Sequence, residues 1–190
     1  LNEQNRIVAK LDELLPKVEA CKERLQKIPT ILKRFRRSVL NSACSGLLTT
    51  DWRKANIDER RNGDGEYPSN WEVVKLGTLT SLVTSGSRGW AKYYADNGSI
   101  FIRAQNINTD KLNLDDIAFV KLPTCAEGLR TKVQTNDILI TITGANVTKS
   151  ALVENKLEDA YVSQHVALVR LTDERLSAFV FLSLLSMAHG

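Results

Sequence analysis

Three segments of this chain gather cations, amides and hydroxyls that could bind a polar, charged ligand. The first, residues 84–94, combines glycines and three aromatic rings with Ser87, Arg88 and Lys92. Because Arg can bind guanine through two hydrogen bonds and Ser can bind phosphate, this composition suits contact with DNA. The alternative is an ordinary surface loop whose aromatic side chains pack on the core.

The second segment, residues 103–106, ends an apolar stretch with Arg103, Gln105 and Asn106. The amide side chains of Gln and Asn offer the donor and acceptor pair that matches adenine. Asn106 fits equally well as a turn residue that hydrogen-bonds to its own backbone. The segment therefore adds three candidate DNA-binding residues, one of which has a structural alternative.

The third segment, residues 143–149, joins two predicted strands and places Asn146 and Lys149 at a hairpin tip. Further along, Gln164 and His165 interrupt an otherwise apolar predicted strand. Polar side chains at such a point are either satisfied internally or face a ligand. For His165 we favour a structural role in the strand over a catalytic one.

The sequence contains no set of residues typical of a catalytic or metal site. There is no phosphate-binding loop, no zinc-type cluster of Cys and His, no glycine-rich adenosylmethionine fingerprint and no base-methylation motif. The paired carboxylates at 115–116 and 158–159 are typical of solvated loops. We therefore predict a binding protein that is not an enzyme and holds no metal or cofactor.

Length and composition limit the remaining possibilities. A chain of 190 residues has room for one domain plus an extension. It has no apolar run long enough for a transmembrane helix and no signal peptide pattern, which predicts a cytoplasmic protein without a membrane partner. The three cysteines, Cys21, Cys44 and Cys125, are widely spaced, and we expect reduced, buried thiols.

An apolar heptad stripe runs through the first forty residues. Two interleaved series, each recurring every seven positions, define one seam along a long helix that must pack on another helix. No second stripe follows, so the partner of the seam is another molecule or a part of the protein not present here. The predicted seam residues, besides Cys21, are Ile7, Leu11, Leu14, Val18, Leu25, Ile28, Leu32, Phe35 and Val39.

The predicted helix spans residues 1–46, with Asn2 as its N-cap and Gly46 just after its end. Pro16 and Pro29 each remove a backbone hydrogen bond and should bend or break it. The unbroken heptad register favours one bent helix. Two helices meeting near residue 28 are the alternative.

Residues 47–70 lose the periodicity and contain turn signals, so we interpret them as a linker. Residues 71–190 have the pattern of a β-rich globular domain, which gives an α+β fold with short helices. The domain is predicted to end in a helix at 174–188 and to be incomplete at its C-terminus. The predicted strands are 71–76, 79–84, 99–104, 117–122, 137–143, 151–153 and 161–171.

Charge is distributed unevenly along the chain. Residues 1–46 hold ten Lys or Arg and five Asp or Glu, whereas the remainder holds sixteen and seventeen. The densest basic cluster lies on the helix, at Lys33, Arg34, Arg36 and Arg37. Such a cluster is either a binding surface for phosphate or an acidic partner, or a solvated flank of the seam.

Several of these segments resemble one known family. Residues 1–15, LNEQNRIVAKLDELL, and their continuation at 32–40 and 43–49 are similar to the conserved spacer helix of the specificity (S) subunits of type I restriction–modification systems. Weaker similarities to the target recognition domains of that family follow in the expected order, at 71–77, 100–107, 137–144 and 161–168.

The resemblance implies a fold and a function. A whole S subunit has two recognition domains, each reading one half of a bipartite DNA site, held apart by two antiparallel spacer helices. Methylation, with adenosylmethionine, belongs to the modification subunits, and cleavage, with ATP and magnesium, belongs to the restriction subunit. This chain has one helix and one recognition domain, and thus corresponds to half of an S subunit.

We therefore expect a non-catalytic subunit that binds double-stranded DNA, modification subunits and a restriction subunit. The seam is expected to pair antiparallel with a second copy, forming a homodimer. The alternative is a coiled-coil scaffold or assembly regulator, which the near-neutral charge of residues 47–190 favours. The expected DNA-binding residues are Ser87, Arg88, Lys92, Arg103, Gln105, Asn106, Asn146 and Lys149.

Overall fold

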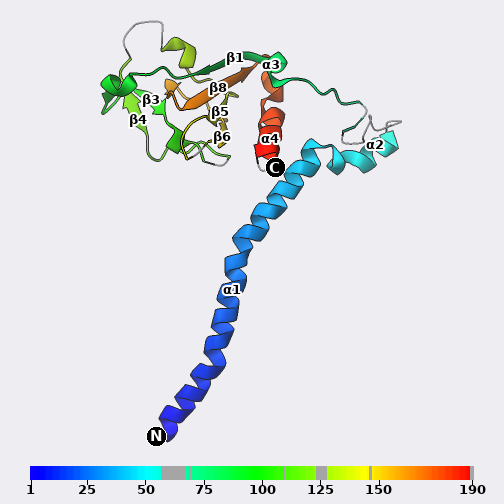
Figure 1. Cartoon of the computed structure of the whole chain (residues 1–190), viewed down its shortest axis with the longest axis vertical. Coiled ribbons are helices and arrows are strands. Elements are labelled where there is room, and N and C mark those ends of the chain that lie inside the picture. The colour runs from blue at the N-terminus through cyan, green and yellow to red at the C-terminus, as the bar shows by residue number, and fades with distance from the viewer. Residues whose placement is uncertain (57–66, 69, 109, 123–127, 146, 189–190) are drawn as a thin grey trace.

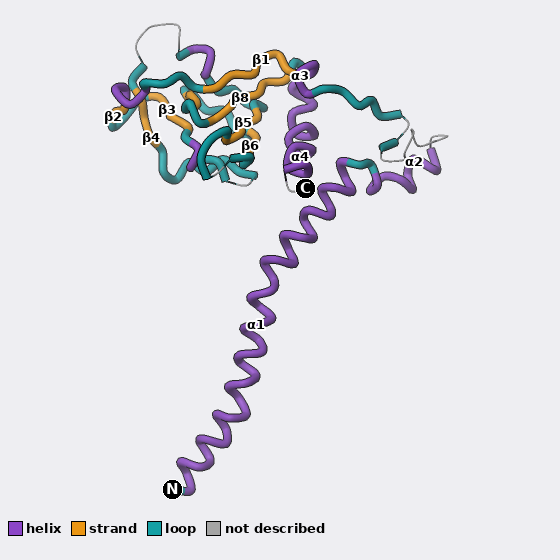
Figure 2. The backbone as a smooth tube through the Cα atoms, in the orientation of Figure 1, coloured by secondary structure: helices purple, strands orange, loops and turns teal. Residues whose placement is uncertain are grey.

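The computed structural model describes residues 1–56, 67–68, 70–108, 110–122, 128–145 and 147–188. A long helix, α1 (Asn2–Cys44), extends away from a β-rich domain with short helices (Figure 1). Figure 2 shows that the strands gather in this domain, at one end of the rod. The α+β fold predicted from the sequence is confirmed. The domain limits at residues 46 and 70 stay predictions.

α1 is one continuous helix of 43 residues, about 64 Å long at about 1.5 Å per residue. It contains both Pro16 and Pro29, so the alternative of two helices is wrong. Asn2 is not the N-cap, because its own backbone is already helical and Leu1 takes that position. Gly46 follows the end of the helix in the left-handed conformation, with φ of 76°.

The domain contains two four-stranded sheets. The first is antiparallel, in the order β1 (Thr80–Ser85), β8 (Val166–Leu171), β5 (Ile138–Thr141) and β6 (Ser150–Leu152). The second has the order β2 (Tyr94–Ala95), β4 (Ala118–Val120), β3 (Ser99–Ile102) and β7 (Ala160–Val162), and only its β3–β7 pair is parallel. The turn at 163–165 carries the chain from the second sheet into the first.

Short helices complete the structure. The α-helices are α2 (Thr50–Asn56), α3 (Leu76–Leu79) and α4 (Ser177–Ala188). Single 3-10 turns occur at Leu47–Thr49, Trp90–Tyr93, Ala104–Asn106, Leu129–Thr131 and Glu174–Leu176. The first ten residues of the predicted linker are thus helical, and residues 57–66 and 69 lie outside the described residues.

Two strand predictions need correction, and one strand was missed. Residues 71–76 do not form a strand, because this stretch packs against α4, where Trp71 meets Phe179 edge-on at 5.8 Å between ring centroids. The predicted strand 161–171 is two strands, β7 and β8, in different sheets. The two-residue β2 was not predicted. The remaining predicted strands are present, with shifts of at most two residues at their ends.

The two faces of β5 serve two different hydrophobic cores. Leu139 packs with Ile102 and Leu168 in a core built from both sheets. Ile138, on the opposite face, packs with Phe181 of α4. Because Ile138 and Leu139 are both fully buried, β5 is a central strand and not the half-buried strand that its alternating sequence predicts.

A buried ion pair ties β8 to the turn before β5. Arg170 Nε and Nη2 donate to the two carboxylate oxygens of Asp137 at 2.8 and 2.7 Å. The Asp137 side chain is completely buried, and it also accepts a hydrogen bond from the backbone N–H of Gln134 at 2.7 Å. This bidentate geometry, with an extra donor, is the arrangement that compensates for burying a carboxylate.

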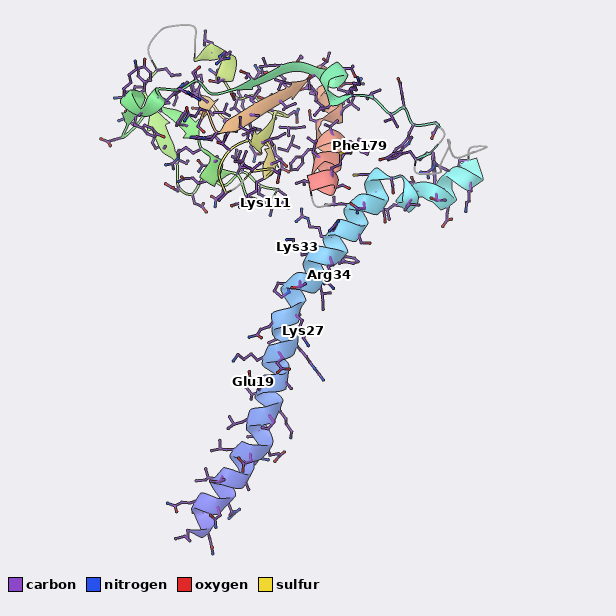
Figure 3. All side chains as sticks on the ribbon, in the orientation of Figure 1. Glu19, Lys27, Lys33, Arg34, Lys111 and Phe179 are labelled. Carbon is purple, nitrogen blue, oxygen red and sulfur yellow. The ribbon has the colours of Figure 1, made fainter. Side chains whose placement is uncertain are left out.

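The C-terminal end of α1 is fixed to the domain, whereas the rest of the helix is not. Leu40 packs into the core between α4 and the first sheet, and Ser186 Oγ donates to Asn41 Oδ1 at 2.6 Å. An ion pair joins Arg36 to Asp110. Figure 3 shows Lys33 and Arg34 on the helix close to the domain, and Lys27 and Glu19 farther along the rod.

None of the helices in the described parts of the chain combines the length and the hydrophobicity needed to cross a membrane.

Candidate nucleic-acid interface

A groove of about 330 Å³ lies where the loops from both sheets meet. Three of the predicted DNA-binding residues, Ser87, Arg103 and Gln105, line it. So do Gln164 and His165, which the sequence marked as polar interruptions of a strand. The remaining lining residues are Gly89, Trp90, Ala91, Tyr94, Phe101, Ala104 and Ser163.

Gly86 allows the first loop to lie against the turn at 163–165. Its N–H donates to the carbonyl of Ser163 at 3.2 Å. A Cβ at this position would lie 2.2 Å from the carbonyl oxygen of Val162, closer than any real contact. Glycine is therefore required here by close backbone approach.

The third loop reaches the same turn through His165. Thr143 Oγ1 and His165 Nδ1 are hydrogen-bonded at 2.5 Å, and the N–H of Ile142 donates to the carbonyl of His165 at 3.0 Å. His165 is exposed and lies in a turn, so its predicted place within a strand is wrong, because the chain changes sheets at this point. The turn thus brings the first and third loops together.

Aromatic residues support the groove from below. Trp90 stacks on Phe101, with ring centroids 4.9 Å apart and planes at 12°, and both are buried. For Trp90, therefore, the alternative that the loop aromatics pack on the core is correct. Tyr94 meets Phe101 edge-on at 5.6 Å and remains 48% exposed. Only Tyr94 of these three rings is available to a ligand over much of its surface.

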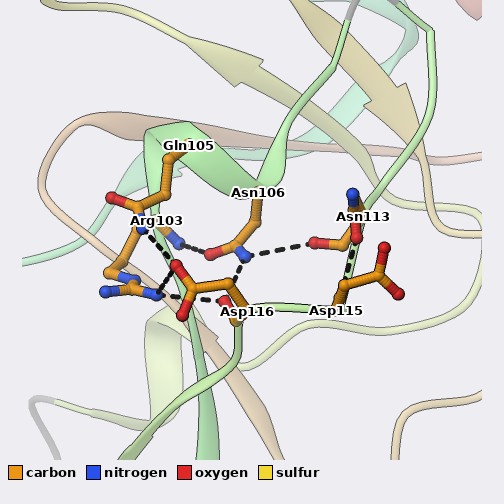
Figure 4. Close-up of polar contacts among 6 residues, drawn as sticks. All are labelled: Arg103, Gln105, Asn106, Asn113, Asp115 and Asp116. Atoms are coloured by element: carbon orange, nitrogen blue, oxygen red, sulfur yellow. Dashed lines mark hydrogen bonds and ion pairs between the residues drawn. The ribbon is translucent and has the colours of Figure 1, made fainter.

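The second segment forms a polar network with Asp116 (Figure 4). Arg103 Nη2 lies 3.1 Å from Asp116 Oδ2, and Gln105 Nε2 donates to the same oxygen at 2.6 Å. Asn106 is buried, and its amide group makes three hydrogen bonds to the backbone, at 2.8 to 3.1 Å. These contacts match the turn alternative for Asn106 and leave its amide without a free end for DNA.

Sequence reasoning missed two residues of this region. The carboxylate of Asp116 is not merely solvated, because it binds two of the side chains that line the groove, those of Arg103 and Gln105. Arg130 is exposed, and its Nη2 donates to Ser87 Oγ at 2.9 Å. Neither residue belongs to a local motif, and only the folded chain brings them to the groove.

The other predicted residues lie around the groove or beyond it. Arg88 and Lys92 are exposed, and Lys92 Nζ lies 5.0 Å from the centroid of the Tyr93 ring. Lys149 is half-buried beside β5, where its carbonyl accepts a hydrogen bond from the N–H of Thr141 at 2.8 Å. Asn146 lies outside the described residues.

A charged cluster at the N-terminal ends of β3 and β7 braces these two strands against each other. Asp159 accepts hydrogen bonds from Ser99 and, at 3.0 Å, from Tyr161, and pairs with Lys132 at 2.9 Å. Partial burial raises the pKa of Asp159, but the bonds from Ser99, Lys132 and Tyr161 outweigh it and leave the pKa below its ordinary value. Partial burial and the bond to Asp159 raise the pKa of the Tyr161 hydroxyl.

Every predicted seam residue on α1 is exposed, from 39% for Val39 to 67% for Phe35. The prediction that Cys21 is buried is wrong within this chain, because Cys21 belongs to the same exposed stripe. Cys44 is half-buried and Cys125 lies outside the described residues. Among the described residues, no group of three or more His, Cys, Asp or Glu could hold a metal ion.

No protein-family model matches the chain. Individual proteins do match it. The chain is 33% identical over 181 residues to the type I restriction enzyme EcoBI specificity subunit of Escherichia coli, an alignment that covers 92% of this chain and 37% of that protein. It is 54% identical over 96 residues to the EcoDI specificity subunit of Escherichia coli, covering 44% of this chain and 22% of that one.

Two solved structures share the fold. The HsdS subunit from Thermoanaerobacter tengcongensis superposes with a TM-score of 0.51 at 19% identity, covering all of this chain and 42% of that one. A chain from a structural study of type I R-M system assembly and conformational transition superposes with a TM-score of 0.55 at 18% identity. The superposition covers 98% of this chain and 41% of that one.

The fold and the matches define a class of protein, the specificity subunits of type I restriction enzymes. The chain belongs to this family, which confirms the resemblance found in its sequence motifs. It spans less than half the length of the relatives that it matches.

Proposed function

We propose that this chain is the sequence-reading half of a type I specificity subunit. Its domain reads one half of a bipartite site in double-stranded DNA, and α1 sets the distance to the other half-site and docks the partner subunits. The groove carries the proposal, because it brings Arg103 and Gln105 of one loop together with Ser87 of another at one surface. Arg and Gln are the side chains whose hydrogen-bonding groups match guanine and adenine in the major groove.

The surface around the groove supports a division of labour between base and phosphate contacts. Arg88 and Lys92 are exposed on the first loop, and Arg130 is exposed on the 129–131 turn beside it, where they can bind phosphates and fix the orientation of the domain on the duplex. Lys149 is a further phosphate contact of the third loop. These cations provide affinity for any DNA sequence, while Arg103 and Gln105 distinguish one sequence from another.

The exposed stripe on α1 supports pairing with a second copy. Ten apolar side chains in heptad register, left in water, would be buried if two copies of α1 pack antiparallel. Such a homodimer has twofold symmetry and presents two identical recognition domains at opposite ends of the coiled coil. We infer that methylation, cleavage and their cofactors, namely adenosylmethionine, ATP and magnesium, belong to the modification and restriction subunits.

The second candidate function is a coiled-coil scaffold or assembly regulator that reads no DNA. The charge of the chain favours it, because residues 47–190 hold sixteen basic and seventeen acidic residues. Asp115 and Asp116 are also exposed near the groove, where phosphates would be repelled. A scaffold of this kind would bind the same partner subunits without sequence preference for DNA.

DNA selection from a random duplex library, by the chain assembled with its modification subunits, separates the two functions. A DNA reader enriches a defined motif. Arg103→Ala and Gln105→Ala should each relax one position of the motif, at a cost of about 1–3 kcal/mol for the preferred base. Lys149→Ala should weaken binding to all sequences alike and flatten its salt dependence. An assembled complex that enriches no motif would support the scaffold.

A further inference from the structure

The two side chains that line the groove as base readers share one anchor, the carboxylate of Asp116. Gln105 Nε2 donates to Asp116 Oδ2 at 2.6 Å, and Arg103 Nη2 lies 3.1 Å from the same oxygen. Arg103 Nη2 also donates to the backbone carbonyl of Asp116 at 3.0 Å. Figure 4 shows both side chains turned toward Asp116.

The position of Asp116 is itself fixed by a buried residue. Asn106 Nδ2 donates to the carbonyl of Asn113 at 3.1 Å and to that of Asp116 at 2.8 Å. The N–H of Asn113 donates in return to the carbonyl of Asn106 at 2.7 Å. Because Asn106 is only 3% exposed, this arrangement is held inside the fold rather than at a mobile surface.

These contacts decide which groups of the readers remain for a ligand. A carboxylate only accepts hydrogen bonds, so the NH₂ group of Gln105 must face Asp116 and its carbonyl oxygen must point elsewhere. Arg103 spends Nη2 on Asp116, and its Nη1 makes no hydrogen bond within the described parts of the chain. A ligand in the groove can thus bind a guanidinium donor of Arg103 beside the amide acceptor of Gln105.

Resting on the function proposed above, we propose that Asp116 is a positioning residue for sequence recognition. It contacts no base and determines specificity by holding Arg103 and Gln105 in one orientation before DNA binds. Long polar side chains lose rotational freedom when they bind, and an anchor that removes this freedom beforehand favours the matching base over others. The same carboxylate, 76% exposed, repels phosphates and lowers affinity for every sequence.

Asp115 provides a matched control. It is the adjacent carboxylic acid and is also exposed, but its carboxylate forms no ion pair or hydrogen bond among the residues that the structure describes, and only its backbone N–H donates, to Asn113 Oδ1. Asp115→Ala and Asp116→Ala remove the same charge one residue apart. Only the second removes the carboxylate that Arg103 and Gln105 share, and it leaves Arg103 with its hydrogen bond to the backbone carbonyl of residue 116.

The experiment compares both variants with the unaltered chain, each assembled with its modification subunits. Binding is measured to the motif from the library selection, to single-mismatch duplexes and to a duplex without the motif. Both variants should bind the unrelated duplex about two- to fivefold more tightly at low salt, because each has lost a negative charge. Asp116→Ala alone should lose about fivefold in discrimination at one or two positions, near the low end for losing a direct base contact.

Thermal unfolding of each variant shows whether the fold is intact. Equal discrimination by the two variants would overturn the role of Asp116 while leaving the DNA-reading function in place. Enrichment of no motif by the unaltered complex would overturn the proposed function and this inference together. Asp116→Asn, which keeps an acceptor for Gln105 but loses the charge, should recover part of the discrimination if positioning is the cause.

Discussion

The helix and the domain of this chain both have regular apolar patterns, but the apolar residues of the helix are exposed and those of the domain are buried. No residue of α1 from Asn2 to Val39 is buried, although its stripe includes Leu25 and Phe35, at 64% and 67% exposure. In the domain, by contrast, Ile102, Leu139 and Leu168 are fully buried in a core of its own. The domain is therefore stabilised within the chain, whereas the stripe on the helix needs a partner from outside it.

Substitution in the seam should have the largest effect, and should affect assembly alone. Leu25→Glu places a carboxylate in the stripe, and in a twofold dimer each change occurs twice. With about 1.5–3 kcal/mol lost per buried leucine, the proposed homodimer should dissociate at least about 100-fold more readily. Sedimentation equilibrium measures this, with Ala20→Glu as a control that adds the same charge outside the stripe. Equal weakening by both variants would contradict the seam.

Breaking the buried ion pair should destabilise the domain and leave assembly unchanged. Asp137→Asn removes the charge that compensates Arg170 and should lower the free energy of unfolding by about 3 kcal/mol, measured by urea denaturation. Asp173→Asn alters an exposed Asp–Arg pair, with Arg175 at 86% exposure, and should have a much smaller effect. A dimer weakened by Asp137→Asn would show that the two regions are not independent.

Gly86→Ala tests how the loops are brought to the groove. Its methyl group would meet the backbone at Val162, so the first loop or the turn must shift, at a cost of about 1–3 kcal/mol. Motif binding should fall with stability, because Ser87 is displaced from the groove. Gly77→Ala is the control, since no atom lies within 4 Å of a Cβ there. An unfolding midpoint that is the same for both variants would rule out the close approach.

Substitution of Asp159 should have the smallest effect on stability, and this effect should depend on pH. The pKa of Asp159 is lowered in the folded chain, so its contribution to stability is present above its ordinary pKa of 3.8. The contribution is lost as the pH falls below that value and the carboxylate is protonated. At pH 7, Asp159→Asn should lower the free energy of unfolding by less than about 1 kcal/mol, because Asp159 is 43% exposed. Thermal unfolding between pH 7 and 3 should show the two chains converging at the acid end.

Periodicity in the sequence was sufficient to predict the main elements. The heptad stripe predicts α1, because it reflects one apolar side of a helix. Alternation predicted the position of β5, but not that both of its faces are buried. The periodicity of the sequence could not predict that residues 71–76 pack on α4 instead of pairing with a strand. Nor could it show that the apolar run 161–171 changes sheets at Gln164 and His165. Both outcomes depend on contacts distant in sequence.

The candidate site was predictable only where side-chain type alone was informative. Arg103 and Gln105 were found because their chemistry matches base edges, and the structure places both in the groove. Asn106 has the same chemistry but is buried, which its sequence position could not reveal. Asp116 and Arg130 act on the groove through contacts 11 and 43 residues away along the chain, beyond the reach of local patterns.

The central claim is that one chain supplies half of a DNA-reading subunit and a second copy supplies the other half. The most direct test is to express it with its modification subunit in a host without adenine methylation and to sequence the modified bases. We predict a bipartite motif with two identical halves in inverted orientation. Formation of the complex without any methylation, or a motif that is not an inverted repeat, would contradict the account.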